Sequence, residues 1–321
     1  MNSEILLTNL SNPTLLFFLF GIIAAAVKSD LEIPQQSTKF ISIYLLFSIG
    51  FKGGQELQHS ENGGEILRSV LFGISIAAII PAYCFYILRK RLGVSNAGAI
   101  AASYGSVSAI TFISAVSYLE MHSLTFNSHM VAVMAIMELP AIVVAFILIN
   151  LYEENREGSK GLGYIVKHSL TNGSVLMLLG SLVIGLIADS KQAEGIKPFT
   201  TDIFKGFLAL FLLEMGMVTA KRFTAFKAYG IFAFFFGIII PLLNGCIVAY
   251  LSKFVVDDIG DRFIFAILAA SASYIAVPAA MRFAAPKADP GLYIPMAIGV
   301  TFPFNITIGI PIYFAIINHF V

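Results

Sequence analysis

The sequence has no tryptophan, only two cysteines and few charged residues. Charged side chains make up 12% of the chain, whereas soluble domains carry roughly a quarter. Cys84 and Cys246 lie inside apolar runs, with no spacing that fits a disulfide framework or a metal motif. The net charge of +1 gives no electrostatic basis for binding nucleic acid, so we expect no nucleic-acid partner.

Hydrophobic residues dominate instead, at 58% of the chain, and the mean hydropathy is +0.85. So little polar surface cannot cover a soluble globule of 321 residues, whereas a lipid bilayer removes that requirement. Ten apolar stretches, most of them close to the roughly 20 residues that cross the hydrocarbon, predict about ten transmembrane helices. The first stretch has no basic region before it and no cleavage site after it, so we expect a membrane span there and no signal peptide. The stretches are 13–28, 38–52, 69–88, 98–118, 129–151, 173–189, 202–220, 228–252, 263–283 and 291–317.

Short sequence words recur in the same order and at a nearly constant offset along the chain. Because five spans per half is an odd number, the second half must enter the membrane from the opposite side. We therefore predict a first repeat over 1–152, a short cytoplasmic linker over 153–172 and a second, inverted repeat over 173–321. The paired words are Ile49-Gly50-Phe51 with Met215-Gly216-Met217, Ile79-Ile80-Pro81 with Ile239-Ile240-Pro241, Ala101-Ala102-Ser103 with Ala269-Ala270-Ser271, and Met134-Ala135-Ile136 with Met296-Ala297-Ile298.

The distribution of Lys and Arg predicts how the chain is oriented. With the N-terminus outside, 13 of the 20 Lys and Arg residues fall on the cytoplasmic side and 7 on the other. Cytoplasmic loops carry the excess of basic residues, so both termini are expected outside.

Spans four and nine are interrupted at their middle by small hydroxyl residues. The stretch 101–109 contains Gly105, and the matching stretch 269–278 contains Pro278. Unwinding a helix at membrane depth frees backbone groups, and the resumed helix presents a partly positive N-terminus that suits an anion. The alternative is close helix packing by small residues. We predict two broken helices, and substrate-binding residues Gly105, Ser106, Val107, Ser108, Ala109, Ser271, Ala272, Ser273 and Tyr274.

Glu138 lies in the middle of the fifth span, where a carboxylate costs at least about 2.5 kcal/mol and is usually functional. We predict a cation or proton role for it; the alternative is a protonated Glu bonded to a freed carbonyl. Ser103, Thr111 and Asn305 complete the predicted ion-coupling set.

Signatures of metalloproteases, hydrolases and Walker-type nucleotide sites are absent, so we expect no enzyme, no catalytic residue and no direct use of ATP. All five histidines lie near the ends of predicted spans. We expect them to be surface residues and not ligands, and we expect no metal site. The histidines are His59, His122, His129, His168 and His319.

Over nearly its whole length the chain resembles the sodium-dependent bicarbonate transporter family of cyanobacteria and other bacteria. The likeness rests on the order and spacing of several motifs. They are Pro13-Thr14-Leu15, 49–54 (Ile-Gly-Phe-Lys-Gly-Gly), 104–111 (Tyr-Gly-Ser-Val-Ser-Ala-Ile-Thr), Leu119-Glu120, 137–141 (Met-Glu-Leu-Pro-Ala), 270–273 (Ala-Ser-Ala-Ser), Arg282, Ala288-Asp289-Pro290, Tyr293 and Ala297-Ile298-Gly299.

This resemblance implies a gate domain from spans 1, 2, 6 and 7 and a core domain from spans 3–5 and 8–10. It implies a homotrimer in the lipid of the bacterial inner (plasma) membrane that imports bicarbonate with sodium by alternating access. The anion would lie where the broken fourth and ninth spans cross, with sodium as the coupling ion and no other cofactor. Some family members are inhibited by a cytoplasmic regulator of the PII type.

The ninth span departs from the family's pattern. Tyr274 stands where the family has an acid, and Ala276 and Val277 replace Ser and Gly, which predicts a more apolar site with one charge fewer. The leading hypothesis is symport of a small anion such as bicarbonate with sodium. Two alternatives remain: a sodium- or proton-coupled transporter of a small organic anion or other solute, and a membrane receptor or scaffold without transport.

Overall fold

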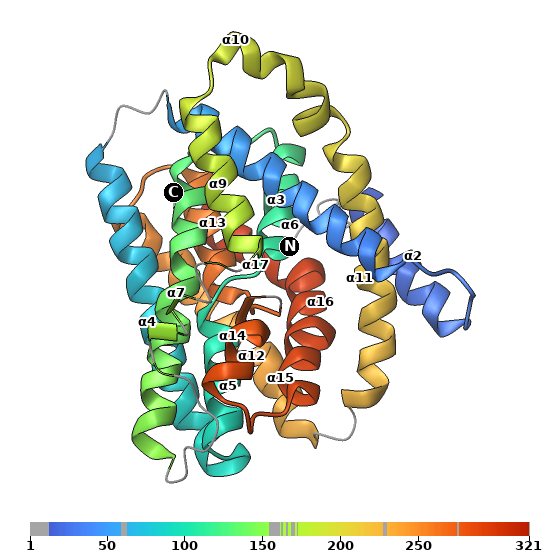
Figure 1. Ribbon diagram of the computed structural model, residues 1–321, viewed down its shortest axis with the longest axis vertical. Helices are drawn as coiled ribbons and strands as arrows, with labels where there is room; N and C mark the ends of the chain where they lie inside the picture. Colours follow the sequence, from blue (N-terminus) through green and yellow to red (C-terminus); the bar gives the residue numbers. More distant parts are fainter. Residues whose placement is uncertain are drawn as a thin grey trace.

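All the regular structure described is helical, and every one of the ten predicted stretches contains helix (Figure 1). The computed structural model describes residues 13–58, 63–153, 161, 163–164, 166–167, 171, 173–226, 230–274 and 276–320. Most of the predicted linker 153–172 lies outside these residues. The first half contains α2 (Pro13–Ala26), α3 (Gln35–Leu57), α4 (Gly63–Leu92), α5 (Val94–Gly105), α6 (Ala109–Met121) and α7 (His129–Tyr152).

The second half begins with α9 and ends with a long, irregular last span. Its elements are α9 (Gly173–Ile187), α10 (Ser190–Ala193), η1 (Glu194–Ile196), η2 (Pro198–Asp202), α11 (Phe204–Phe226), α12 (Gly230–Leu251), η4 (Ser252–Phe254), α13 (Ile259–Ala270), α14 (Ala276–Ala284), α15 (Pro290–Met296), η5 (Ala297–Thr301), α16 (Phe302–Phe304), η6 (Asn305–Gly309) and α17 (Ile310–His319).

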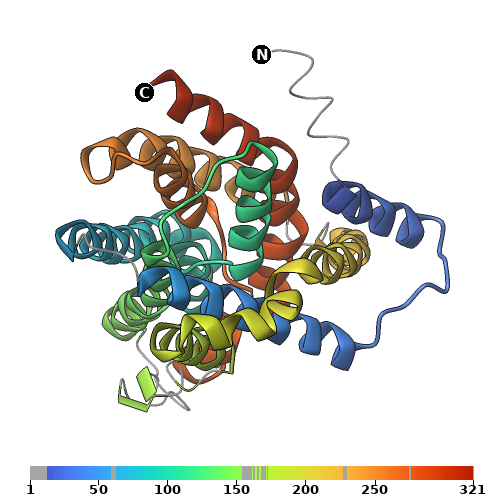
Figure 2. The ribbon, with the colours of Figure 1, turned by 90° about the horizontal axis from the view of Figure 1, so that it is seen from above.

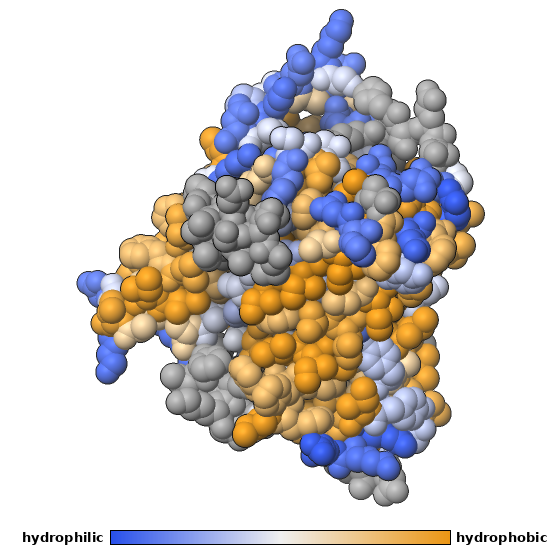
Figure 3. Space-filling model, turned by 180° about the vertical axis from the view of Figure 1, so that it is seen from behind, coloured by the Kyte–Doolittle hydropathy of each residue, from blue (hydrophilic) through white to orange (hydrophobic). Residues whose placement is uncertain are grey.

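Six of the described helical segments are long and apolar enough to cross a membrane, and α2 and α9 contain shorter apolar helices. The outer surface fits a lipid environment. Orange, hydrophobic residues form a broad band across the middle in Figure 3, with blue, hydrophilic residues above and below it. Large side chains such as Ile79, Leu243 and Ile247 are about half exposed on this surface. A band of this extent is expected where lipid covers the protein. The six segments are Gly63–Leu92, Val94–Met121, His129–Tyr152, Pro198–Lys221, Gly230–Phe254 and Pro290–His319.

Glycines bring two pairs of helices into backbone contact. A Cβ atom added to Gly21 of α2 would lie 2.1 Å from the Leu213 carbonyl oxygen of α11. A Cβ on Gly54 of α3 would lie 2.1 Å from the Leu182 carbonyl oxygen of α9. Small residues allow this approach in membrane helices, and Figure 2 shows α2 and α11 side by side at the edge away from α4 and α7.

The two glycine pairs are equivalent contacts with the halves exchanged. α2 and α3 are the first and second helices of the first half, and α9 and α11 are the first and second spans of the second half. In each pair the first helix of one half therefore packs on the second helix of the other half, as expected if the two halves are related. The inversion of the repeats and the gate domain stay predictions.

The remaining spans surround the two broken helices. α4 packs against α5 and α7, and α12 packs correspondingly against α13 and α17. Pro81 of α4 lies against Gly105, where an added Cβ would meet the proline ring at 2.4 Å. Pro241 of α12 cannot donate to the Gly237 carbonyl one turn earlier, and Thr301 Oγ1 donates to that carbonyl at 2.8 Å. The matching prolines thus position α5 and the last span.

Candidate functional site: the crossing of two broken helices

The fourth span is interrupted at Ser106–Ser108. α5 ends at Gly105, and Ser106 is extended, with φ −88° and ψ 173°. Ser108 is the N-cap of α6: its Oγ accepts a hydrogen bond from the Thr111 backbone N–H at 3.2 Å. Gly105 was expected within the break, and it is instead the last helical residue, kept small by the contact with Pro81.

The ninth span is interrupted directly after Ala270. Ser271 ends α13 in an extended conformation like that of Ser106, with φ −81° and ψ 167°. Ser273 Oγ accepts from the Val277 backbone N–H at 3.4 Å in the first turn of α14. Pro278 does not lie in the break: it occupies the first turn of α14, where a missing N–H costs no helical hydrogen bond.

Hydrogen bonds join the two breaks. The Ser273 backbone N–H donates to the Ser103 carbonyl at 2.8 Å, and the Ser103 hydroxyl donates to the Ser273 carbonyl at 2.5 Å. The Ser108 backbone N–H donates to Ser271 Oγ at 3.0 Å. The structure therefore brings together the residues that the sequence placed at one site from two distant stretches.

These bonds also show which hydroxyls are already engaged. Ser103, Ser108 and Ser273 bond backbone groups as described above, and Ser271 Oγ donates to the Leu268 carbonyl at 2.9 Å. Ser106 Oγ is different: it is completely buried and has no hydrogen-bond partner among the described residues. Four of the five serines thus hold the breaks in shape, and the fifth, Ser106, makes no such bond among the described residues.

Tyr274 supplies a second unpartnered hydroxyl at the crossing. Its oxygen is buried and lies near the Ser108 side chain without meeting hydrogen-bond geometry with it. The Tyr274 ring packs edge-on against Phe302, with centroids 6.2 Å apart. A buried polar group without a partner costs about 1–3 kcal/mol. Two such groups at one crossing point to a missing polar partner.

The rest of the predicted substrate site is small and apolar. Val107 and Ala272 are buried and Ala109 is half-buried, so they form walls without charge. The described side chains of 106–109 and 271–274 are all neutral. An anion bound here would be held by hydroxyls and backbone N–H groups.

The four predicted ion-coupling residues do not share one hydrogen-bond network in the described part of the chain. Asn305 Nδ2 donates to the Ala270 carbonyl at 2.7 Å, so it satisfies the group freed at the end of α13. Its Oδ1 accepts from the Tyr313 hydroxyl at 3.1 Å. Ser103 and Thr111 also lie at the breaks. Glu138 on α7 shares no described hydrogen bond with them, and its buried Oε2 has no partner in the described part of the chain.

Sequence reasoning missed the irregular last span. Two π-helical turns, η5 and η6, interrupt it, and such turns are frequent at functional sites. Thr301 ends η5 and bonds the Tyr104 hydroxyl at 2.7 Å, and Asn305 begins η6. Two prolines in the sequence could have indicated these irregular turns. Pro303 and Pro311 each remove a helical N–H two residues after a π turn.

A cavity of about 590 Å³ lies between α3, η2, α11 and the end of α6. Across it, Lys205 Nζ forms an ion pair with Glu120 Oε2 at 3.0 Å. The cavity reaches Val116, which is about 12 Å along α6 from Ser108 at 1.5 Å per residue. The serines of the breaks are at most 4% exposed, so the crossing is closed off from this cavity.

Comparison with known proteins identifies the family of the chain. The family model of the Na+-dependent bicarbonate transporter superfamily matches residues 13–318, which include both breaks and the glycine-paired helices. No match was found among curated proteins. The chain, a multi-pass helical membrane protein, belongs to the Na+-dependent bicarbonate transporter superfamily.

Proposed function

We propose that the protein is a secondary transporter that imports a small anion, with bicarbonate as the first candidate, together with sodium by alternating access. The observation that carries the proposal is the pair of buried, unpartnered hydroxyls of Ser106 and Tyr274 at the crossing. Each hydroxyl can donate a hydrogen bond to an oxygen of an anion. The first amides of α6, at Ala109 and Ile110, have no acceptor within their own helix and add partial positive charge.

Sodium would complete the charge balance. The crossing has no charged side chain among its described residues, so an anion bound alone would keep its full charge in a buried site. Carbonyls at the breaks, such as that of Ser103, carry a second lone pair that can coordinate a cation. Binding the two ions together removes the net charge, which is the physical basis for symport.

Alternating access is supported by the closed crossing and by the glycine-paired helices. The pairs α2–α11 and α3–α9 are held by backbone contact, so we expect each to move as a unit against the helices that carry the breaks. The cavity bounded by α3, α11 and α6 is where such a movement would open a path.

The test is uptake of labelled bicarbonate into proteoliposomes with and without an inward sodium gradient. We expect gradient-dependent uptake, and a loss of at least tenfold in Ser106→Ala, because that hydroxyl has no structural bond to replace. Ser75→Ala is the matched control: Ser75 is exposed on α4 and bonds only the Leu71 carbonyl one turn earlier. Sodium-independent uptake would refute symport, and normal uptake by Ser106→Ala would refute the site.

A second candidate is a small organic anion, favoured by the aromatic and aliphatic surroundings. Tyr274 packs on Phe302, and Ala276 and Val277 are buried at the start of α14. If this is the substrate class, small carboxylates such as acetate or lactate will raise the unfolding temperature more than bicarbonate does. Binding without flux of either anion would identify a receptor.

A further inference from the structure

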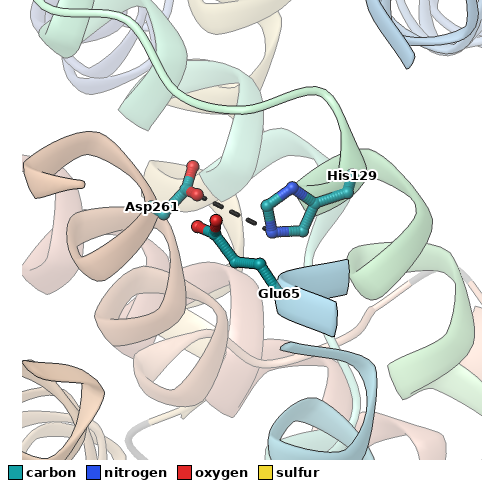
Figure 4. A group of neighbouring side chains, drawn as sticks. All are labelled: Glu65, His129 and Asp261. Carbon is teal, nitrogen blue, oxygen red and sulfur yellow. Dashed lines mark ion pairs between the residues drawn. The ribbon is translucent and has the colours of Figure 1, made fainter. Parts of the chain in front are cut away.

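Three ligand-type side chains meet at the ends of three helices, away from the crossing. Glu65 lies in the first turn of α4, His129 is the first residue of α7, and Asp261 lies in the first turn of α13. One nitrogen or carboxylate oxygen from each lies within 4.8 Å of the others. Figure 4 shows the imidazole and both carboxylates directed into the same space.

The cluster is buried, which overturns the expectation that His129 is a surface residue. Asp261 is completely buried and His129 is 3% exposed, because both start helices that pack inside the molecule. His122 is half-buried and bonds the Tyr118 carbonyl, and His59 and His168 lie outside the described residues. The three ligands come from distant parts of the chain, so no sequence spacing reveals them.

Neighbouring groups fix the orientation of the ligands. Asp261 accepts from the backbone N–H of Asn127 at 2.6 Å and from its side-chain amide at 2.9 Å. The Asp258 carboxylate accepts from the Asp261 backbone N–H at 2.9 Å, as the N-cap of α13. Ser69 Oγ lies 3.0 Å from His129 Nε2. This is the nitrogen that faces Asp261, so the Ser69 contact does not fix the ring through its other nitrogen, whereas a carboxylate held by hydrogen bonds, as Asp261 is, is typical of metal ligands.

The charges of the cluster suit a cation. His129 Nε2 lies 3.7 Å from Asp261 Oδ2, so a protonated imidazole could pair with that carboxylate. Glu65 and Asp261 bring two carboxylates to the same space, which favours a bound cation. Buried carboxylates are stable where they are paired or where they coordinate a metal.

We propose that Glu65, His129 and Asp261 bind one divalent transition-metal ion of the zinc type. Zn²⁺ takes imidazole nitrogen and carboxylate oxygen at about 2.0–2.2 Å, which places tetrahedral ligand atoms about 3.4 Å apart. The 3.7 Å separation of His129 and Asp261 is close to this value. Imidazole favours zinc over magnesium or calcium, and a water molecule would take the fourth position.

The ion would join the two halves of the chain at one end of the core. It would hold α4 and α7 of the first half to α13 of the second, and α13 leads directly into the break at Ser271. Asp261 is nine residues from Ala270, about 14 Å along the helix, so the metal site is separate from the crossing. Its role is to stabilise the start of the helix that carries half of the anion site.

The experiment uses the full chain, purified in detergent and stripped with EDTA. After dialysis against ZnCl2, MnCl2 or MgCl2, the metal content is measured by mass spectrometry, and unfolding is followed by circular dichroism at 222 nm. We expect about one zinc per chain, and a rise of several degrees in unfolding temperature that magnesium does not produce.

Glu65→Gln and His129→Gln should each weaken zinc binding at least tenfold and remove the zinc-dependent rise. Glu65 is half-buried at a helix start, so its variant is expected to fold even if His129→Gln does not. His122→Gln is the control, because it removes another imidazole while leaving the cluster intact. No bound zinc, equal stabilisation by magnesium, or unchanged zinc binding by Glu65→Gln would each overturn the proposal.

Discussion

Ser103 and Ser273 exchange two hydrogen bonds between the broken helices, one from a backbone N–H and one from a hydroxyl. The pair joins carbonyls and donors that the two interruptions would otherwise leave without partners inside the protein. It is therefore a structural link, whereas Ser106, three residues away on the same segment, has a hydroxyl that no described group uses.

Ser103→Ala should lower the free energy of unfolding by about 1–3 kcal/mol, because the Ser273 carbonyl loses its hydroxyl donor in a buried site. Ser106→Ala should leave the stability unchanged or raise it, since it removes an unsatisfied group. The chain has no tryptophan, so a thiol-reactive dye that reports exposure of the buried Cys84 is a suitable probe of unfolding. Equal destabilisation by both substitutions would contradict the division between linking and ligand-binding serines.

Gly105→Ala should destabilise the protein by about 1–3 kcal/mol and impair uptake, because the new Cβ would overlap the Pro81 ring and push α5 away from α4. Gly180→Ala on α9 is the control, since nothing lies within 4 Å of an added Cβ. Relief of the glycine penalty should stabilise the control by about 0.5–1 kcal/mol. A Gly105→Ala variant as stable as the control would show that this contact is not tight.

Asn305→Ala should lower the unfolding temperature and reduce sodium-dependent uptake together, because the Ala270 carbonyl loses its donor and the Tyr313 hydroxyl keeps only the Pro241 carbonyl. Tyr313→Phe separates the two effects. It leaves the bond to Ala270 intact and frees Asn305 Oδ1, the atom that could coordinate a cation. The sodium dependence of uptake is measured for both variants. An unchanged sodium dependence in both would remove Asn305 from the predicted ion-coupling set.

The orientation can be tested by cysteine labelling in a background of Cys84→Ala and Cys246→Ala. Ser190→Cys, at the exposed start of α10, should react with a membrane-impermeant maleimide in intact cells. Lys90→Cys, at an exposed position in the last turn of α4, should react only after permeabilisation. The opposite pattern would place both termini inside.

The positions of the breaks could be predicted from the sequence because small hydroxyl residues interrupt two apolar stretches at matching places in the two halves. Their internal structure could not. The sequence predicts that Gly105 and Pro278 lie in the breaks. Both are helical in the structure, and the extended residues are nearby serines, Ser106 and Ser271. Whether a serine caps a helix, links two segments or faces a ligand depends on partners far away in the chain.

The burial of individual polar side chains depends on tertiary contacts that the sequence pattern does not show. His129 lies at a predicted span end, which normally means the interface, but it is buried because Ser69 and Asp261 arrive from other helices. Glu138 is half-buried with its Oε2 enclosed, and it shares no described hydrogen bond with the crossing, which its mid-span position did not indicate. The substrate and ion roles of these residues stay predictions.

The π-helical turns of the last span have a consequence for its angular phase. In a regular α-helix, eight residues turn the chain by 800°, which would leave Tyr313 about 80° away from Asn305 around the axis. The extra residue absorbed by η6 makes the separation equivalent to seven residues, or about 20°. Tyr313 thus reaches Asn305 and the Pro241 carbonyl on the same side. Deleting one residue from η6 would therefore remove the π turn without changing this phase, because Tyr313 would then lie seven residues from Asn305 in a regular α-helix, about 20° away.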